Sequence, residues 1–456
     1  MSLVLNAELQ DLLESRGPRY TSYPTALMFN TGFGAADFER ALQARDAQAP
    51  LSLYVHIPYC RSLCYYCACT KIVTRNDARI ARYLNALLQE IEWLGRHLGG
   101  SRRLQQLHFG GGSPSGLAPE QLGVIMEALH EVVDFEPDEA IAAAIEVDPR
   151  TVGGAELRVY RALGFNRISF GVQDFDQQVQ SAVNRVQSAL HVQRLIESAR
   201  TLGYRGINAD LIYGLPHQTV ESFSRTVDTL AAMMPDRIAV YSYAHLPDVF
   251  KAQRLIDAHA LPTGSRKVEL FLAAQERLAA VGYQHIGMDH FSRPGDELAQ
   301  ALADGSLQRN FQGYSTHAGC DIVGLGMSAI SQVGAVYAQN VKSDRDYEAL
   351  VAQGPATERG LQLTPGDLIR RDLIQKLMCR TELDLVAFSA EHGIDFGAYF
   401  AHEHGALLRL QALGLLQLSD TRLAITPLGR YFLRPICAVF DAHRAPGATQ
   451  RYSQAA

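Results

Sequence analysis

The first 260 residues alternate short apolar runs with longer segments of helical periodicity. The runs are rich in β-branched and aromatic residues, which is typical of buried strands. They cover residues 51–57, 104–109, 141–147, 167–172, 207–213 and 237–243. The segments between them carry apolar residues three and four positions apart, which predicts helices that bury one face. These helices are expected at 79–98, 120–132, 155–163, 189–202 and 221–233.

Strands that alternate with helices predict a parallel sheet built of right-handed βαβ units. Because six such units fall short of the eight of a closed barrel, the expected fold class is α/β with an open, partial (β/α)6 barrel. After residue 260 the pattern predicts a helix at 267–281, a Gly-rich polar passage, and mostly helices beyond 365 with a β-like stretch at 415–425. We therefore expect four parts: an amino-terminal arm or lid (1–48), the partial barrel (49–260), an extension that completes the site (261–360) and a mostly helical, winged-helix-like carboxyl-terminal domain (361–456).

The chain is weakly acidic, with 42 Lys and Arg against 48 Asp and Glu and a net charge of −6. This balance, without a long basic run, excludes nucleic-acid binding as the main function. No apolar run reaches the roughly 18 residues of a membrane span, and the amino terminus lacks the basic region of a signal peptide. We therefore expect a cytoplasmic protein whose cysteines stay reduced.

Four of the seven cysteines fall within ten residues, at positions 60, 64, 67 and 69. A structural zinc site, chance clustering and an iron–sulfur cluster are the alternatives. Zinc takes its ligands from well-separated pairs, and four thiolates this close are hard to arrange around one ion. An iron–sulfur cubane is larger, so cysteines of a single loop can reach three of its corners. The pattern therefore favours iron–sulfur, whereas Cys320, Cys379 and Cys437 are expected to be small buried hydrophobes.

Glycines and polar residues follow the predicted strands at one end of the sheet, where the loops of α/β barrels build active sites. They are the glycines at 110–112, Glu146, Asp148, Gln173, Asp174, Asp210 and residues 243–245. The glycines lack the spacing of a dinucleotide site, and either a plain turn or the close approach of a ligand explains them. The carboxylates suit hydroxyl and amine donors, although each alone is typical of a surface or capping acid. Their shared placement predicts an enzyme.

The sequence CxxxCxxC directly after the first strand, followed by Gly-Gly-Gly-Ser-Pro at 110–114, resembles the radical S-adenosylmethionine enzymes. Further stretches resemble one family among them, the oxygen-independent coproporphyrinogen III oxidases. These stretches are 17–26, 54–58, 60–69, 145–150, 171–175, 210–216, 243–247 and 310–314. The resemblance runs from about residue 15 to the carboxyl terminus.

The resemblance implies a radical-SAM barrel in which Cys60, Cys64 and Cys67 hold a [4Fe–4S] cluster and Cys69 does not ligate iron. One S-adenosylmethionine would chelate the open iron, with a second molecule nearby. Positions that match the cofactor contacts of the family are Tyr54, Tyr66, Gly111, Gly112, Ser113, Glu146, Gln173, Arg185, Asp210, Ala244 and Ile330.

The resemblance also implies the reaction. A 5′-deoxyadenosyl radical would take a hydrogen from the β-carbon of a propionate, and loss of CO₂ and one electron would leave a vinyl group. Two such events convert coproporphyrinogen III to protoporphyrinogen IX in haem biosynthesis. The expected partners are this substrate and a low-potential electron donor, without nucleic acid, and the expected state is a monomer.

Arginines near the motifs are candidates for the four substrate carboxylates, although a solvated or structural role is the more common one. They are Arg19, Arg150 and Arg309. Tyr66, Ala68, Thr70 and Ser113 depart from the residues most common in the family, and Thr70 is the departure that could tune activity. Two other interpretations are a related haem-binding branch, which typically lacks the arm at 17–26 and a cysteine at position 69, and a zinc-stabilised scaffold.

Overall fold

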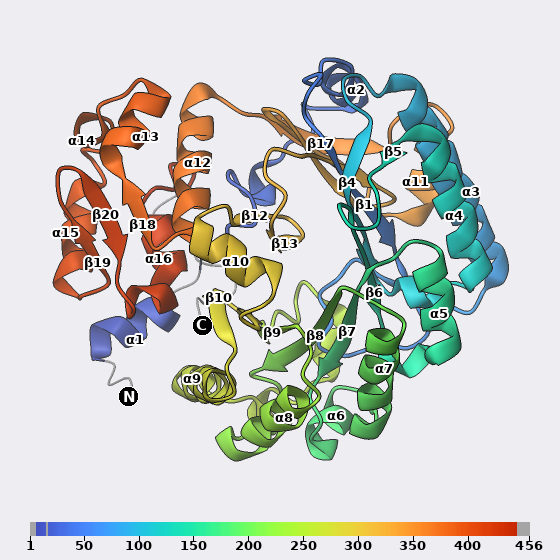
Figure 1. Cartoon of the computed structure of the whole chain (residues 1–456), viewed down its shortest axis with the longest axis horizontal. Helices are drawn as coiled ribbons and strands as arrows, with labels where there is room; N and C mark the ends of the chain where they lie inside the picture. Colours follow the sequence, from blue (N-terminus) through green and yellow to red (C-terminus); the bar gives the residue numbers. More distant parts are fainter. Residues whose placement is uncertain (1–5, 15–16, 445–456) are drawn as a thin grey trace.

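A computed structural model describes residues 6–14 and 17–444; the predicted arm and carboxyl-terminal domain also include residues 1–5, 15–16 and 445–456, which lie outside this range. Six parallel strands form the centre of the fold, as predicted, in the spatial order β9-β8-β7-β6-β4-β1 (Figure 1). The strands are β1 (Leu51–Ile57), β4 (Arg103–Gly111), β6 (Ala142–Val147), β7 (Arg167–Gln173), β8 (Gly206–Tyr213) and β9 (Arg237–Ser242), with a short β5 (Asp134–Phe135) beside β4.

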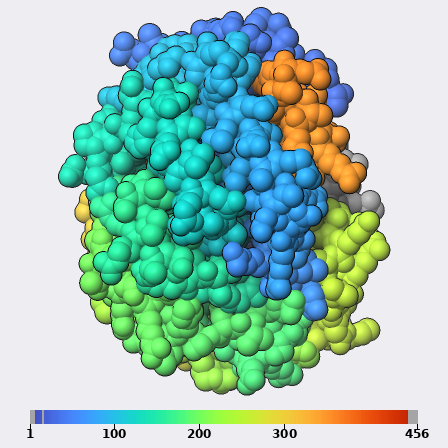
Figure 2. Space-filling view, turned by 90° about the vertical axis from the view of Figure 1, so that its right-hand side faces the viewer, coloured from blue at the N-terminus to red at the C-terminus, as the bar shows by residue number. Residues whose placement is uncertain are grey.

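Helices cover the outer face of this sheet. Figure 2 shows them as one layer that runs from α3 in blue through α4 and α5 to the green helices. They are α3 (Asp77–His97), α4 (Pro119–Val132), α5 (Gly154–Ala162), α6 (Gln177–Ala182), α7 (Ala189–Thr201) and α8 (Val220–Ala232). Among the described helices none is both long and apolar enough to cross a membrane.

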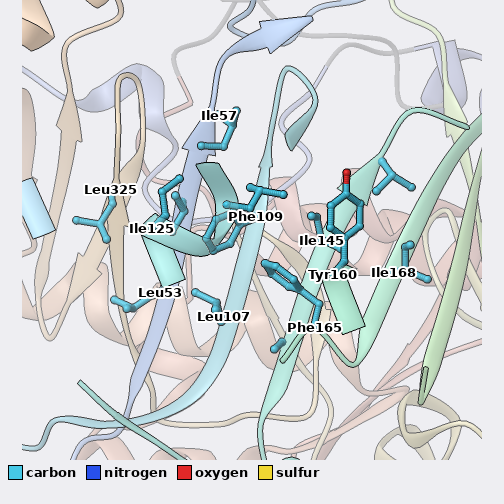
Figure 3. Close-up of a cluster of buried hydrophobic side chains, with 14 of the residues drawn as sticks. Leu53, Ile57, Leu107, Phe109, Ile125, Ile145, Tyr160, Phe165, Ile168 and Leu325 are labelled. Atoms are coloured by element: carbon cyan, nitrogen blue, oxygen red, sulfur yellow. The ribbon is translucent and has the colours of Figure 1, made fainter. Parts of the chain in front are cut away.

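The main hydrophobic core lies between the strands and these helices (Figure 3). Alternate strand residues such as Leu107 and Phe109 are fully buried. The ring of Phe109 packs edge-on against that of Phe165, with 5.1 Å between ring centroids. Burial of each such side chain contributes roughly 1.5–3 kcal/mol. Because outward positions build the core, the remaining positions of each strand are free to line the inside of the barrel.

Residues 261–360 extend the sheet at both edges, which the sequence pattern did not predict. At the β9 edge, β10 (Gln284–Gly287) and β11 (His290–Ser292) pair antiparallel. At the β1 edge lie a parallel β14 (Asp321–Leu325) and then antiparallel strands. The other elements here are α9 (Gly264–Ala280), α10 (Glu297–Asp304), the hairpin β12 (Gln308–Asn310) and β13 (Gly313–Ser315), β15 (Ile330–Val333), β16 (Val336–Asn340), α11 (Asp344–Val351) and β17 (Thr357–Gln362).

A second core packs the carboxyl-terminal part against the arm, α9 and α10. Cys379 and Cys437 are buried in it as predicted, whereas Cys320 is half-buried. The predicted β-like stretch is a hairpin, and a third strand that was not predicted completes a small sheet of order β18-β20-β19. The elements are α12 (Pro365–Cys379), β18 (Glu382–Asp384), α13 (Leu385–His392), α14 (Phe396–Tyr399), α15 (His404–Ala412), β19 (Leu416–Leu418), β20 (Arg422–Ile425) and α16 (Leu433–Ala438). The division of the chain into four parts stays a prediction.

The amino-terminal arm runs from one side of the molecule to the other (Figure 1). Its first helix, α1 (Ala7–Glu14), lies beneath the carboxyl-terminal domain, and α2 (Ala35–Gln43) contacts α3, β16 and β17. Between them Asn30 forms a β-bridge with Gly360. The arm therefore joins the carboxyl-terminal domain to the β1 edge of the sheet.

Candidate active site

A cavity of about 870 Å³ opens at the carboxyl ends of the parallel strands, where the sequence predicted the site. The predicted residues that line it are Cys60, Cys64, Tyr66, Cys67, Gly111, Gly112, Ser113, Glu146, Gln173, Arg185 and Asp210. Cys69 lines it as well, and we call it the cysteine cavity.

The loop that carries the cysteines is closed at its base by two short parallel strands, β2 (Tyr59–Cys60) and β3 (Ile72–Val73). His56, near the end of β1, fixes the loop to the barrel. Its Nε2 lies 3.0 Å from the carbonyl oxygen of Thr70, and its Nδ1 lies 3.0 Å from the hydroxyl oxygen of Tyr54. Burial lowers the pKa of His56 to about 4, so the neutral ring donates to Thr70 and accepts from Tyr54. These contacts attach the cysteine loop to the barrel.

The spacing of the cysteines fits a cluster better than a single ion. Tetrahedral zinc with Zn–S bonds of about 2.3 Å needs its sulfurs about 4 Å apart. Within residues 6–14 and 17–444, one group of three potential ligand atoms lies within 4.8 Å of one another, and it contains no cysteine. Thiolates that converge on one cavity at a wider spacing suit the corners of a cubane.

That other group lies in the carboxyl-terminal domain and consists of Asp372, Glu391 and His392. The ammonium of Lys376 lies 2.6 Å from a carboxylate oxygen of each acid, and His392 Nε2 lies 2.8 Å from Asp372. A side-chain cation thus occupies the place of a metal ion, and the group is structural.

Two arginines give the cysteine cavity a positive wall. Arg150 Nη2 lies 3.4 Å and Arg185 Nη1 3.3 Å from the sulfur of Cys64. Asp148 holds both guanidinium groups. Burial opposes the ionisation of Asp148, but the two arginines outweigh it and keep the pKa of Asp148 below its usual value. Hydrogen bonds from N–H groups to thiolate sulfur stabilise an anionic cluster, so the residues present fit one.

The glycine run packs directly on the end of β1. Gly111 has φ +116°, and a Cβ there would lie 2.6 Å from the ring of His56. A Cβ on Gly112 would lie 2.4 Å from the carbonyl oxygen of Pro58. Both glycines are therefore required by the fold of the site itself, through left-handed backbone at one position and close chain packing at both.

Two carboxylates face the cavity from inside the barrel. Glu146 accepts a hydrogen bond from His108 Nε2 at 2.9 Å. Asp210 accepts hydrogen bonds from Asn208 Nδ2 at 2.8 Å and from the Ser169 hydroxyl at 3.2 Å. Burial, and then the neighbouring charge of Glu146, raises the pKa of Asp210 to about 7. The pair suits a cationic ligand that carries hydroxyl or amine donors.

Gln173 ends β7 with φ +71°, a backbone conformation that side-chain-bearing residues rarely adopt. The strand register shifts at this point, between Gly171 and Gln173. Arg185 binds the carbonyl oxygen of Gly171 beside it. Strain of this kind is common where a side chain is directed at a ligand.

Three residues matched to the cofactor contacts do not line the cavity. Tyr54 lies behind it on β1. Ala244 is tied to the cysteine loop indirectly, because Gln253 Nε2 donates to the carbonyl oxygens of both Ala244 and Tyr66. Ile330 packs in a small apolar cluster with residues of the arm. Their contact with a cofactor stays a prediction.

A second cavity of about 960 Å³ fills the inside of the barrel, and we call it the barrel chamber. It adjoins the cysteine cavity, because both are lined by Glu146, Ser169, Asp210 and Tyr241. Sequence reasoning missed several of its polar residues, namely His108, Ser169, Asn208, Tyr241 and His290. The signal for the strand residues is a period of two: half-open polar positions alternate with buried apolar ones along β4, β7 and β8.

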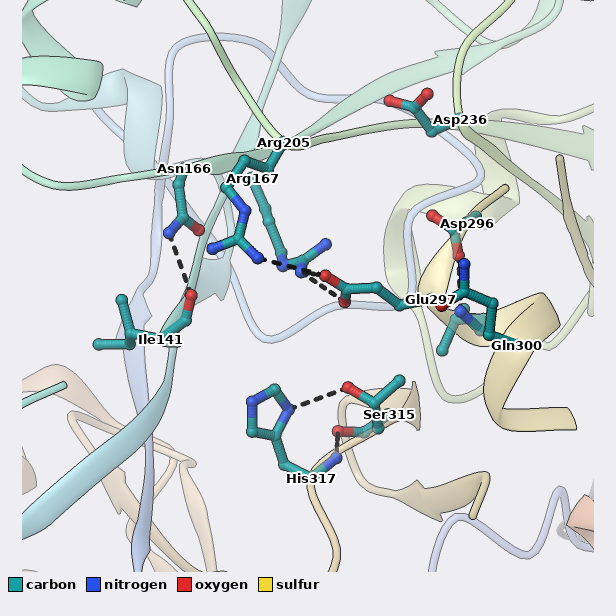
Figure 4. A network of polar contacts seen from close by, with 12 residues as sticks. Ile141, Asn166, Arg167, Arg205, Asp236, Asp296, Glu297, Gln300, Ser315 and His317 are labelled. Carbon is teal, nitrogen blue, oxygen red and sulfur yellow. Dashed lines mark hydrogen bonds and ion pairs between the residues drawn. The ribbon is translucent and has the colours of Figure 1, made fainter. Parts of the chain in front are cut away.

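An ion-pair network closes the opposite, amino-terminal end of the barrel (Figure 4). Glu297, from α10, binds Arg167 at the start of β7 and Arg205. Arg237, at the start of β9, binds Asp296 with 2.8 Å between Nε and Oδ2. Paired charges therefore fill this end of the barrel, and the cysteine cavity adjoins the chamber at its other end.

We expect Glu297→Gln to lower the free energy of unfolding by about 2 kcal/mol. The guanidinium of Arg167, 10% exposed, would lose its counter-charge, and breaking a buried pair costs about 3–5 kcal/mol, reduced here because Glu297 is 39% exposed. Chemical denaturation checks this value. Glu382→Gln is the matched control, since Glu382 and Arg422 are both more than half exposed and their pair should contribute below about 1 kcal/mol. Equal effects of the two substitutions would contradict the conclusion that the ion pairs of Glu297 stabilise the amino-terminal end of the barrel.

The three candidate arginines have different surroundings. Arg150 belongs to the cysteine cavity, where Asp148 binds it. Arg19 of the arm binds Asp289 with 2.8 Å between Nη1 and Oδ2. Arg309 of β12 is buried and forms no ion pair among the described residues.

Of the departures from the family pattern, Tyr66 and Ser113 line the cavity, and Thr70 contributes its carbonyl group to the hydrogen bond with His56.

Comparison with known proteins decides the family. Residues 54–230 match the model of the radical SAM superfamily, and residues 363–432 match that of the HemN C-terminal domain. An oxygen-independent coproporphyrinogen III oxidase of Pseudomonas aeruginosa is 49% identical over 451 residues, which cover 98% of each chain. The protein of the same name from Escherichia coli is 46% identical over 440 residues, covering 96% of this chain and 95% of that one. This chain belongs to the oxygen-independent coproporphyrinogen III oxidase family.

The solved structure of Escherichia coli coproporphyrinogen III oxidase (HemN), described as a radical SAM enzyme, agrees with this assignment. It matches with a TM-score of 0.90 and 45% identity, covering 93% of this chain and 98% of that one. Membership of the oxygen-independent coproporphyrinogen III oxidase family confirms the radical-SAM barrel with its mostly helical carboxyl-terminal domain, the oxidoreductase class, and the [4Fe–4S] and S-adenosylmethionine cofactors. It excludes the zinc-stabilised scaffold.

Proposed function

We propose that this chain converts coproporphyrinogen III to protoporphyrinogen IX without oxygen, by oxidative decarboxylation of two propionate side chains. The observation that supports the proposal is that the cysteine cavity adjoins the barrel chamber, since one is lined by the residues proposed to hold the cofactors and the other leaves room for substrate. The enzyme acts as a cytoplasmic monomer, takes electrons from a low-potential donor and binds two molecules of S-adenosylmethionine.

Cys60, Cys64 and Cys67 hold the cluster, and Cys69 is not a ligand. When bound, the cluster and S-adenosylmethionine supply the one-electron chemistry that removes a hydrogen atom from the propionate β-carbon. The propionate then loses CO₂ and one electron, which leaves a vinyl group.

The side chains of the cavity orient the cofactors and protect the reactive carbon centre, and they do not transfer protons. Arg150 and Arg185 donate hydrogen bonds to the sulfur of Cys64 and so orient it as a ligand. Glu146 and Asp210 accept hydrogen bonds from the hydroxyl and amine groups of a cofactor. The ion pairs at the amino-terminal end of the barrel close one route for water into the chamber, and less water there means fewer side reactions of a reactive carbon centre.

The first test is an anaerobic assay of the iron–sulfur-reconstituted protein with coproporphyrinogen III, S-adenosylmethionine and a low-potential reductant. Protoporphyrin and 5′-deoxyadenosine are quantified by chromatography, and both should appear together. Deoxyadenosine alone would mean a different substrate. Neither product, with the cluster present, would favour the haem-binding branch.

Binding of S-adenosylmethionine should weaken below pH 7. Asp210 has its pKa raised to about 7, chiefly by burial, and a cationic ligand binds its ionised form. The ionised fraction falls as pH falls, so the Kd should rise by up to about tenfold per pH unit below this pKa. Equilibrium dialysis of the reconstituted protein between pH 6 and 8 measures it. Asp210→Asn should bind more weakly and lose this dependence; a variant that keeps the wild-type slope would show that another group titrates.

A further inference from the structure

His290 lies in one wall of the barrel chamber and is held from behind, outside the chamber, by a hydrogen-bonded chain of two further side chains, Asp289 and Arg19. His290, at the start of β11, lines the chamber. Its Nδ1 lies 2.8 Å from Oδ1 of Asp289, whose other oxygen lies 2.8 Å from Nη1 of Arg19 on the arm. The imidazole packs edge-on against the rings of Tyr241 and Tyr314, which fixes its plane.

Around Asp289, positively charged and imidazole side chains outnumber the carboxylates. Burial opposes ionisation of Asp289, but Arg19, His290 and Arg309 together hold its pKa far below the usual value. One carboxylate thus faces two guanidinium groups and an imidazole. In the described chain Arg309 is 4% exposed, and its Nε and Nη1 have no hydrogen-bond partner. Its guanidinium carbon lies 4.6 Å from the ring centroid of Tyr314.

An enclosed guanidinium with unmade hydrogen bonds is costly, and a nearby anion offsets part of that cost. Asp289 accepts a hydrogen bond from His290 Nδ1–H. Nε2, the other ring nitrogen, has no hydrogen-bond partner among the described residues, and His290 lines the chamber. A carboxylate in the chamber would offer Nε2 an acceptor, and an imidazole with an acceptor at each ring nitrogen carries both protons.

We propose that His290 binds a carboxylate of the substrate, with Nε2–H as the donor. Asp289 and Arg19 are positioning residues that hold the imidazole, and Arg309 supplies enclosed positive charge behind it. Because His290 lines the chamber but not the cysteine cavity, the carboxylate it binds belongs to a propionate other than the one being oxidised. This subsite rests on the proposed function, since coproporphyrinogen III carries four such groups.

The subsite predicts a specific kinetic signature. His290→Phe keeps the size of the side chain and removes the donor, so the KM for coproporphyrinogen III should rise by about tenfold to a hundredfold, with a smaller change in kcat. His290→Gln restores a neutral donor and should recover part of the loss. Arg19→Met should raise KM by a smaller factor through Asp289. Cleavage of S-adenosylmethionine without substrate should be unchanged in all three variants.

The tetramethyl ester of coproporphyrinogen III separates carboxylate binding from a merely structural role, because it keeps the macrocycle and lacks the charges. Its inhibition constant should be the same for wild type and His290→Phe. An unchanged KM in His290→Phe would overturn the subsite, as would an inhibition constant that rises by the same factor as KM. Either result leaves the proposed function in place if wild type forms protoporphyrinogen. A wild type that forms none overturns both.

Discussion

Replacing Cys60, Cys64 or Cys67 by serine should abolish the cluster and all product formation. A serine hydroxyl is a poor iron ligand, so each substitution leaves one corner of the cluster without its bond to the loop. Cys69→Ser should keep the cluster, although Cys69 lines the same cavity. Iron and sulfide content, together with the visible absorption of the anaerobically reconstituted protein, measures this difference.

Cys320→Ser is the control for general effects of thiol removal. Cys320 is half-buried beside the start of β14 and does not line the cysteine cavity. It should retain iron, sulfide and activity. Loss of iron from Cys69→Ser would make the ligand assignment wrong, and retention of a full cluster in any of the other three variants would do the same.

Gly111→Ala should reduce product formation at least a hundredfold in a chain that still folds. The new methyl group would meet the ring of His56, and left-handed backbone costs a further 1 kcal/mol or so. Displacing His56 breaks its hydrogen bonds to Tyr54 and to the carbonyl group of Thr70, so the cysteine loop loses its attachment to the barrel. Product formation and iron content of the purified variant measure the effect.

Gly123→Ala is the matched control. Gly123 lies inside α4, where a Cβ would make only an ordinary contact, 3.7 Å from Leu163. Alanine in a helix interior should stabilise the fold by about 0.5–1 kcal/mol and leave activity unchanged. If Gly111→Ala were as active as Gly123→Ala, the close packing of the glycine run would not matter for the site.

The sequence predicted the central strands well because their patterns are strong. Positions 51–57 carry Leu, Leu, Val and Ile at every second residue, the period-two pattern of a strand, and the structure has the same limits for β1, which lies between β4 and β14. The strands of the extension were missed because they are three to six residues long and mix polar with apolar positions. Such strands form because an existing sheet edge offers partners, which no local pattern records.

The residues of the site likewise include some that the sequence predicted and some that it did not. Motif residues such as Glu146 and Asp210 converge because the carboxyl ends of parallel strands meet at one edge, so their positions followed from strand prediction. His290 could not be found in this way. It faces the chamber only because β11 pairs with β9, and it is oriented by Arg19, more than 250 residues earlier.

The path of the arm also has a consequence for the order of events during synthesis. Arg434 donates to the carbonyl oxygen of Pro18, Tyr20 donates to Asp441, and the Tyr23 hydroxyl accepts from the amide of Ala442. These contacts close a loop of more than 400 residues, so the arm cannot dock until nearly the whole chain has left the ribosome. Arg19, which holds Asp289 in place, is therefore synthesised early but docks late. Iron–sulfur insertion can precede that moment, whereas the wall of the chamber is completed only in the released protein.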